Sequence, residues 1–171
     1  MSILLIDSGN TFLKTGLVSE VGTEIRNIQK LTDIGEITDL SEIEKAICSD
    51  VGGKFNSIGE YLKGYNIPCI KCDHHLRLPF KMNYKTPETL GADRIAAISY
   101  AYKHHYGLNT LIIDIGTCIT YDLLTKNGHY KGGAISPGIQ MRLKAMHQFT
   151  AGLPEIKEEE IQFLVEGKST K

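Results

Sequence analysis

The stretch Leu4-Leu-Ile-Asp7-Ser-Gly9-Asn-Thr11 recurs at residues 111–118 as Leu-Ile-Ile-Asp114-Ile-Gly116-Thr117-Cys118. In both places an apolar run rich in branched residues ends at Asp-x-Gly, which predicts a buried strand followed by a tight turn. Two segments of mixed polar and apolar residues follow each copy and predict two more strands, at 12–18 and 23–31 and at 119–124 and 130–135. The repeat therefore indicates two similar lobes, each opening on three strands.

Further elements are expected between and after the two copies. The clearest helix spans residues 91–106, carries Asp93 in its first turn and ends at Gly107. One face of this helix is expected to hold Ile95, Ala96, Ser99 and Tyr102. The other signals are a short helix over 39–47, a helix over 55–63, a strand over 67–70, a surface loop over 78–90, and a helix that Pro137 opens, with Ile139, Leu143 and Met146 as its apolar stripe.

The composition is that of an ordinary globular chain. Of 171 residues, 42% are hydrophobic and 23% are charged, which argues against intrinsic disorder. The formal net charge is −1, so the chain has no basic surplus for binding nucleic acid. The N-terminus has a short apolar run before Asp7 and no positively charged segment, which predicts neither a signal peptide nor a membrane span. We expect a cytoplasmic protein that binds neither nucleic acid nor membrane, with its four cysteines as reduced thiols.

An Asp-x-Gly turn at the end of a strand is suited to hold phosphate or a metal ion. The glycine lets backbone N–H groups approach phosphoryl oxygens, and the carboxylate can hold Mg²⁺ directly or through water. A single turn of this kind is typical of a simple Asx turn, but two of them favour a grip on the β- and γ-phosphates of a nucleotide. Lys14 then either neutralises phosphoryl charge or is a solvated lysine, and Asp93 is either catalytic or a complement to the helix dipole.

Two other motifs indicate different chemistry. The run Cys69-x-x-Cys72-Asp-His74-His75 suggests zinc, but the second ligand pair of a zinc finger is missing, so metal binding there stays open. Gly167-Lys-Ser-Thr170 resembles the end of a P-loop, yet that motif requires a glycine where this chain has Gln162. We therefore exclude a P-loop and keep the two Asp-x-Gly turns as the candidate nucleotide site.

Four motifs in register resemble one known family. They are residues 6–14 around Asp7, residues 83–94 from Asn83-Tyr84 to Gly91-Ala-Asp-Arg94, residues 113–117 around Asp114, and Gly132-Gly-Ala-Ile-Ser-Pro-Gly138. Their order and spacing resemble those of type III pantothenate kinases over essentially the whole chain. The resemblance implies the superfamily of acetate and sugar kinases, Hsc70 and actin, an α/β fold of two ribonuclease-H-like lobes related by duplication. We expect the first lobe over residues 1–110 and the start of the second over residues 111–171.

The activity that the resemblance implies is transfer of the γ-phosphoryl group of ATP to the primary hydroxyl of pantothenate, the first step of coenzyme A biosynthesis. Enzymes of this family are homodimers that use Mg²⁺ and a monovalent cation, K⁺ or NH₄⁺. Asp93 corresponds to the proton acceptor, Asp114 to the ligand of the monovalent cation, and Asp7 is a candidate ligand of Mg²⁺. Residues that correspond to ATP contacts are Asp7, Ser8, Gly9, Asn10, Thr11, Phe12, Leu13, Lys14 and Thr117. Residues that correspond to pantothenate contacts are Tyr84, Gly91, Ala92, Asp93, Arg94 and Thr170, with Arg94 as a partner for the substrate's carboxylate.

Two alternatives to this assignment are kept. One is another small-molecule phosphotransferase or phosphatase of the same superfamily, although the Tyr84 loop lies outside the shared nucleotide frame. The other is a non-catalytic, kinase-like binding or regulatory protein, against which the four intact site residues Asp7, Lys14, Asp93 and Asp114 argue. The second copy begins near Leu111 and has far fewer residues than the first. We therefore expect a chain that is truncated within its second lobe.

Overall fold

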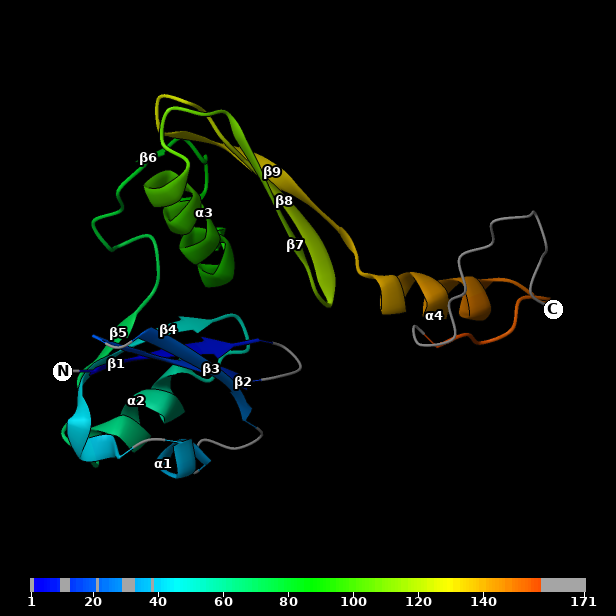
Figure 1. Ribbon diagram of the computed structural model, residues 1–171. Coiled ribbons are helices and arrows are strands. Elements are labelled where there is room, and N and C mark those ends of the chain that lie inside the picture. Colours follow the sequence, from blue (N-terminus) through cyan, green and yellow to red (C-terminus); the bar gives the residue numbers. More distant parts are fainter. Residues whose placement is uncertain (1, 10–12, 21, 29–32, 38, 158–171) are drawn as a thin grey trace.

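A computed structural model describes residues 2–9, 13–20, 22–28, 33–37 and 39–157 of the protein (Figure 1). These residues form two β-sheets with helices packed against them. The strand order is β3-β2-β1-β4-β5 in the first sheet and β6-β9-β8-β7 in the second. The α/β class expected from the sequence is therefore confirmed.

The first sheet combines an antiparallel meander with two parallel strands. Its elements in chain order are β1 (Ser2–Ser8), β2 (Leu13–Ser19), β3 (Gly22–Ile28), α1 (Ile34–Ile37), β4 (Ile43–Asp50), α2 (Phe55–Lys63) and β5 (Cys69–Lys71). β2 is antiparallel to both β1 and β3, whereas β4 runs parallel to both β1 and β5. The strand predicted in the first copy of the repeat and the two strands predicted after it correspond to β1, β2 and β3 and are confirmed.

The core of the first lobe follows from the alternation of side chains along β1. Leu4 and Ile6 are buried, and because successive side chains point to opposite faces of a strand, both lie on one face of the sheet. On that face they belong to one packed cluster with Ile34 of α1 and with Ile58 and Leu62 of α2. Burial of these branched side chains is the main stabilising contribution to this half of the chain.

The second sheet repeats the meander. Its strands are β6 (Lys81–Met82), β7 (Thr110–Ile115), β8 (Cys118–Leu124) and β9 (His129–Pro137), and the helix α3 (Ala92–His104) lies between β6 and β7 in the chain. β8 is antiparallel to β7 and to β9, and the short β6 runs parallel to β9. α3 contacts β4 of the first sheet as well as β7 and β8 of the second, and Figure 1 shows it between the two sheets. One helix thus connects the two halves of the molecule.

Packed side chains form two separate clusters. The cluster of the first sheet gathers buried residues between Leu4 and Ile67, and that of the second gathers residues between Cys72 and Tyr130. α3 belongs to the second cluster, although it follows the first copy of the repeat. The lobe boundary expected at residue 110 stays a prediction. Among the described helices, none is long and apolar enough to span a membrane.

The helix predicted over residues 39–47 is wrong. Asp39 caps a single 3-10 turn, Leu40–Glu42, by accepting a hydrogen bond from the backbone N–H of Ser41 at 2.9 Å. The chain then continues as β4, which lies between β1 and β5 and buries Ile43, Ala46 and Cys48. The helix-start signal is local and covers one turn, whereas pairing with two neighbouring strands decides the conformation of the apolar residues that follow.

The expected buried face of α3 is partly wrong. Ile95 is buried, but Ala96 is exposed, and the buried stripe continues through Ile98 and Ala101. Ile95, Ile98 and Ala101 follow one another at intervals of three residues. α3 contacts both sheets, and it therefore buries a different face from the one expected from the sequence. The predicted loop over residues 78–90 contains β6 and a 3-10 turn, Pro87–Thr89, which gives this segment more regular structure than expected.

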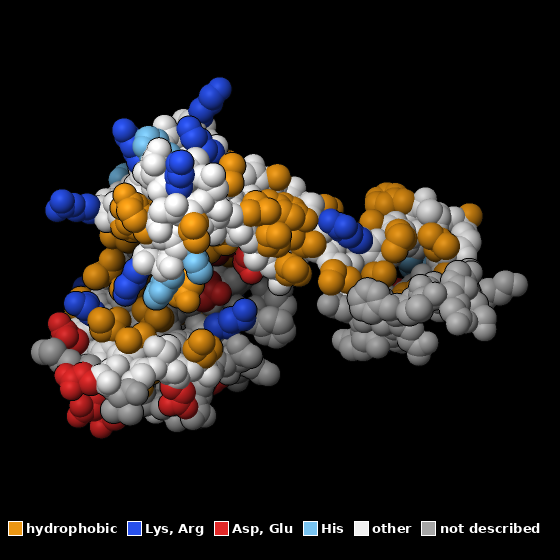
Figure 2. Space-filling view, turned by 45° about the horizontal axis from the view of Figure 1, so that its top comes forward, with side chains coloured by type: hydrophobic (Ala, Val, Ile, Leu, Met, Phe, Trp, Pro, Cys, Tyr) orange, Lys and Arg blue, Asp and Glu red, His pale blue; other side chains and the backbone are white. Residues whose placement is uncertain are grey.

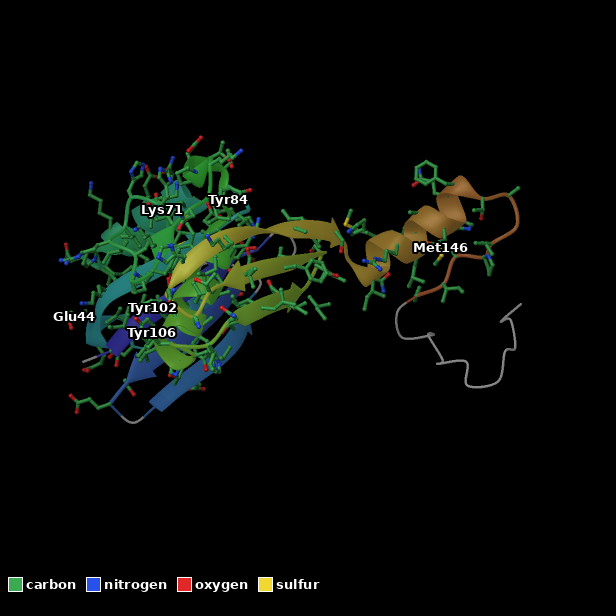
Figure 3. The ribbon with its side chains drawn as sticks, turned by 90° about the horizontal axis from the view of Figure 1, so that it is seen from above. Glu44, Lys71, Tyr84, Tyr102, Tyr106 and Met146 are labelled. Atoms are coloured by element: carbon green, nitrogen blue, oxygen red, sulfur yellow. The ribbon has the colours of Figure 1, made fainter. Side chains whose placement is uncertain are left out.

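The helix predicted to open at Pro137 starts two residues later. Pro137 is the last residue of β9, where it pairs with Cys118, and Gly138 precedes α4 (Ile139–Phe149). α4 extends away from both sheets (Figures 1 and 3), and none of its residues is buried. Within the expected apolar stripe Ile139 and Leu143 are half-buried and Met146 is 47% exposed. Phe149, at the end of the helix, is 80% exposed, and Figure 2 shows orange side chains on this arm.

The second sheet has an uncovered apolar face where the first has its core. Leu111, Ile113 and Ile115 of β7 are all exposed, although the first two correspond in the repeat to the buried Leu4 and Ile6. In the first lobe, α1 and α2 cover this face and β4 pairs with the free side of β1. The part of the chain that the structure describes holds no equivalents of these elements in the second lobe, which is incomplete, as expected from the sequence.

Candidate active site

The two Asp-x-Gly turns face one cavity. Asp7 lies near the end of β1, opposite Lys14 of β2, and Asp114 lies near the end of β7, opposite Thr120 of β8. Both carboxylates line a cavity of about 610 Å³. Its walls come from β1, β2, the start of α3, the β7–β8 turn and the start of α4, and they include Asp7, Gly9, Lys14, Val51, Asp93, Asp114, Gly116, Thr117, Thr120, Gln140, Met141 and Lys144. Of the residues that the sequence singled out, the cavity brings together Asp7, Gly9, Lys14, Asp93, Asp114 and Thr117.

The first turn rests on the connection between β4 and α2. The carbonyl of Ser8 accepts hydrogen bonds from the backbone N–H groups of Val51, at 3.0 Å, and Gly52, at 3.2 Å. Asp50 accepts from the N–H of Gly52 at 3.1 Å and from that of Phe55 at 2.9 Å. Burial alone would raise the pKa of Asp50, but the nearby Ser8 side chain and these backbone N–H groups lower it. An ionised Asp50 therefore holds the connection between β4 and α2, and this connection in turn binds the carbonyl of Ser8.

Gly138, just before α4, lies in close contact with the second Asp-x-Gly turn. The N–H of Gly116 donates to the carbonyl of Cys118 at 2.9 Å, and the N–H of Gly138 donates to the carbonyl of Thr117 at 3.1 Å. A Cβ atom at Gly138 would overlap the carbonyl oxygens of both Gly116 and Thr117. Gly138 therefore allows the start of α4 to lie against the turn.

Asp93 is held at the first turn of α3. Its Oδ1 atom accepts a hydrogen bond from the backbone N–H of Arg94 at 2.8 Å. Burial raises the pKa of Asp93 most, and the negative charges of Asp114 and Asp7 raise it further, against the lowering effect of the Arg94 hydrogen bond. A carboxylate with a raised pKa at the edge of a polar cavity is suited to accept a proton from a hydroxyl.

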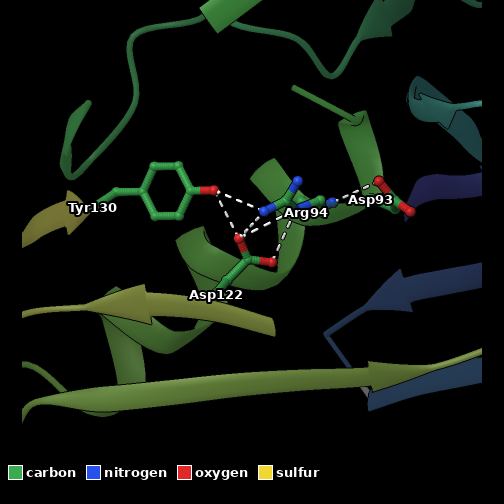
Figure 4. Close-up of polar contacts among 4 residues, drawn as sticks. All are labelled: Asp93, Arg94, Asp122 and Tyr130. Atoms are coloured by element: carbon green, nitrogen blue, oxygen red, sulfur yellow. Dashed lines mark hydrogen bonds and ion pairs between the residues drawn. The ribbon is translucent and has the colours of Figure 1, made fainter. Parts of the chain in front are cut away.

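The arginine next to Asp93 points away from the cavity. Arg94 is 7% exposed, and its guanidinium forms an ion pair with Asp122, itself 1% exposed, at 2.6 Å (Figure 4). Tyr84 stacks its ring near that of Tyr130, with centroids 5.9 Å apart. Of the residues that correspond to pantothenate contacts, Asp93 lines the cavity, whereas Tyr84, Gly91, Ala92 and Arg94 do not.

Several expected site residues are not placed in the cavity wall. Asn10, Thr11, Phe12 and Thr170 lie outside the described residues, and so does the Gly167–Thr170 motif. Leu13 is buried in the first core, so its side chain contributes packing. Three residues of α4 were missed, Gln140, Met141 and Lys144, which line the cavity although they are far from either copy of the repeat. The signal that could have found them is Pro137-Gly138, which begins the helix beside the second turn.

The possible zinc motif gains no support. The described residues contain no group of three His, Cys, Asp or Glu side chains that could hold a metal ion. Cys48, Cys69, Cys72 and Cys118 are all free thiols. Cys72 is buried, and its thiol donates to the carbonyl of Ala92 at 3.7 Å, which is a packing role at the base of α3.

One family model and several curated relatives match this chain. A family model described as type III pantothenate kinase matches residues 3–171. The type III pantothenate kinase of Christiangramia forsetii is 43% identical over 157 residues, covering 88% of this chain and 64% of that protein. That of Bacteroides fragilis is 40% identical over 159 residues, covering 91% of this chain and 65% of that protein. A solved structure, the PPX-GPPA enzyme of Aquifex aeolicus, has a TM-score of 0.45 and 13% identity, covering 94% of this chain and 59% of that one.

The family model and the curated relatives agree with the motifs described above. The chain spans about 65% of the length of the curated relatives it matches. The family model nevertheless extends over both copies of the Asp-x-Gly repeat and over the segment that carries Asp93. The chain belongs to the type III pantothenate kinase family.

Proposed function

We propose that the protein transfers the γ-phosphoryl group of ATP to the primary hydroxyl of pantothenate. The observation that carries this proposal is the convergence of Asp7, Asp93, Asp114 and Lys14 on one cavity, in a chain of this family. Phosphoryl transfer needs alignment and charge neutralisation more than covalent chemistry. Two phosphate-binding turns, a lysine and a proton acceptor around one space supply these requirements.

In the proposed mechanism the two turns hold the phosphates and Asp93 acts on the acceptor. The two Asp-x-Gly turns approach the β- and γ-phosphates, and Lys14 neutralises charge on the transferred group. Asp93 orients the hydroxyl and accepts its proton as the oxygen attacks phosphorus. The raised pKa of Asp93 favours this proton transfer, since the protonated product is stabilised by the same burial.

The donor set fits a magnesium ion that arrives with the nucleotide. Mg²⁺ in kinases is usually held by one or two carboxylates together with substrate phosphates and water. Asp7 and Asp114 face the cavity from opposite turns, and the described residues offer no complete metal cage of their own. We assign Asp7 to Mg²⁺ and Asp114 to a monovalent cation, K⁺ or NH₄⁺. When bound, the metal ion would neutralise charge that develops on the phosphates.

The remaining assignments rest on family membership. We propose Asn10, Thr11, Phe12 and Thr117 as further ATP contacts, and Tyr84, the Gly91–Arg94 segment and Thr170 as pantothenate contacts. The Arg94 side chain is engaged with Asp122, so its contribution to the substrate would come from its backbone or its remaining nitrogen. Homodimer formation and cytoplasmic localisation stay predictions, which sedimentation and cell fractionation can test.

Coupled measurement of ADP release tests the proposal. The assay uses pantothenate and a panel of other hydroxyl acceptors, with and without K⁺, on this chain and on a version extended to the length of its relatives. We expect pantothenate-dependent ADP release that Asp93→Asn lowers by about 100-fold or more while ATP affinity stays within about threefold. Asp39→Asn, which changes an exposed aspartate that does not line the cavity, is the matched control. Release with another acceptor, or none with pantothenate in the extended version, would contradict the proposal.

A further inference from the structure

A buried network joins the start of α3 to the second sheet. Nε of Arg94 donates to Oδ1 and Oδ2 of Asp122 at 3.1 and 3.0 Å, and Nη2 donates to Oδ1 at 2.6 Å. Nη2 also donates to the hydroxyl of Tyr130 at 3.1 Å, and that hydroxyl donates to Oδ1 of Asp122 at 2.7 Å. Figure 4 shows these contacts around Arg94, beside Asp93. Four hydrogen bonds therefore hold the guanidinium, and two, one of them shared with it, hold the tyrosine hydroxyl.

The network occupies space that a glycine leaves free. Gly133 of β9 lies opposite Asp122 of β8. A Cβ atom there would overlap the carbonyl of Tyr121 and would lie 2.8 Å from both Nη2 of Arg94 and Oδ1 of Asp122. Any side chain at this position would push the guanidinium off its partner. The sheet is thus shaped to admit Arg94 at the point where the ion pair forms.

Stability alone is a weak explanation for this network. Burying two charges costs a large desolvation penalty, and an apolar pair of the same volume is often as stable or more stable. Arg94 and Asp122 are 7% and 1% exposed, and Tyr130 is fully buried, so water contributes little to solvating them. Unlike an apolar contact, an ion pair fixes the orientation of the arginine side chain, because a guanidinium bound through two of its nitrogens can rotate little.

The orientation of the Arg94 side chain matters because Arg94 directly follows Asp93 in the chain. The Arg94 N–H donates to Oδ1 of Asp93, so the backbone that Asp122 anchors through the guanidinium also holds the carboxylate. Asp122 and Tyr130 belong to the same sheet as Asp114, on the far wall of the cavity. An anchor on that sheet sets the separation between Asp93 and the second turn.

We propose that Asp122, together with Tyr130, is a positioning residue that acts through Arg94 to set the Asp93 carboxylate relative to the second phosphate turn. The inference rests on the proposed kinase function for its catalytic consequence. Its structural part stands on the contacts alone. Neither residue lines the cavity, so each acts at a distance from the reacting atoms.

Two variants and two readouts test the positioning role. Asp122→Asn keeps the shape but weakens the hold on the guanidinium, and Tyr130→Phe removes one hydroxyl while keeping the ring contacts with Phe80 and Tyr84. In the coupled assay we expect Asp122→Asn to lower kcat about 10- to 100-fold with the KM for ATP nearly unchanged, and Tyr130→Phe to lower kcat about threefold. Tyr106→Phe, which changes an exposed tyrosine, is the matched control.

Amide hydrogen exchange tests the same role without turnover. The Arg94 amide should exchange faster in Asp122→Asn and in Tyr130→Phe, because its bond to Asp93 loosens, while β1 amides keep their protection. If Asp122→Asn fails to fold, Tyr130→Phe carries the test. Unchanged exchange at Arg94 in the folded variants, or faster exchange at β1 to the same degree, would overturn the proposal. An inactive wild-type enzyme with faster Arg94 exchange in the variants would instead refute the kinase function and leave the anchor supported.

Discussion

Replacing Gly91 with alanine should displace the Asp93 carboxylate. The backbone of Gly91, with φ −57° and ψ 142°, suits alanine, so the substitution adds no backbone strain. A Cβ atom there would overlap Oδ1 of Asp93, whereas Cγ1 of Val51, at 3.7 Å, is in ordinary contact. The group that must yield is therefore the carboxylate that we assign to proton transfer.

The size of the effect follows from the size of the displacement. The carboxylate must move by roughly 1 Å to restore ordinary contact, and a misplacement of that size lowers turnover about 100-fold. This loss corresponds to about 2.7 kcal/mol of transition-state stabilisation. The coupled ADP assay measures it as a fall in kcat. Gly59→Ala is the matched control, because nothing lies within 4 Å of a Cβ at that α2 position. It should leave turnover unchanged and stabilise the fold by about 0.5–1 kcal/mol.

A double-mutant cycle separates this displacement from a general disturbance of α3. In an Asp93→Asn background there is no proton-accepting carboxylate left to misplace. Gly91→Ala should then lower the residual kcat by less than about threefold. A Gly91→Ala enzyme with wild-type turnover would refute the reasoning. The same refutation follows from a hundredfold loss that persists in the Asp93→Asn background, since the damage would then act through another group.

Three other substitutions probe stability and nucleotide binding. Ile6→Ala should lower the free energy of unfolding by about 2–5 kcal/mol, because Ile6 is 2% exposed. Ile113→Ala, at the equivalent position of the second copy, should lower it by about 1 kcal/mol, because Ile113 is 50% exposed. Equal losses in urea unfolding would contradict this reasoning. Asp93→Asn should stabilise the fold at neutral pH, since burial raises the pKa of Asp93 and makes its ionised form costly, and the gain should vanish below about pH 4, as melting temperatures can check. Gly138→Ala should weaken ATP binding measured by calorimetry, because its Cβ would overlap backbone oxygens of the Thr117 turn; unchanged affinity would argue against a phosphate role for that turn.

The features that could be predicted best are those that occur twice in the sequence. The apolar strand and the Asp-x-Gly turn recur around Asp7 and Asp114, and the recurrence outweighs what either copy indicates alone. Asp93 could be predicted because a helix with a clear start and end carries it. Residues 39–47 show the opposite case, since the cap at Asp39 is a local signal and the strand that follows is decided by neighbours distant in sequence.

The arginine network shows what local patterns leave out. Arg94 and Asp122 are 28 residues apart, and the tyrosine hydroxyl comes from a third element. Nothing in the immediate surroundings of Asp122 marks it as buried, because an aspartate in the middle of a strand is usually solvated. Only the packing of α3 against β8 makes the pairing visible. The same packing turns the Arg94 side chain away from the cavity, where the family resemblance had suggested a substrate contact.

The position of α3 explains how the proposed site could distinguish donor from acceptor. Each copy of the repeat contributes a similar Asp-x-Gly turn, so in the proposed mechanism the two turns alone would not distinguish donor from acceptor. α3 follows the first copy, and Asp93 therefore enters from one side of the cavity. In the proposed mechanism that side must be the acceptor side, because a proton acceptor is useful only next to the attacking hydroxyl. The proposed anchor from Asp122 to Arg94 would keep this asymmetry in place.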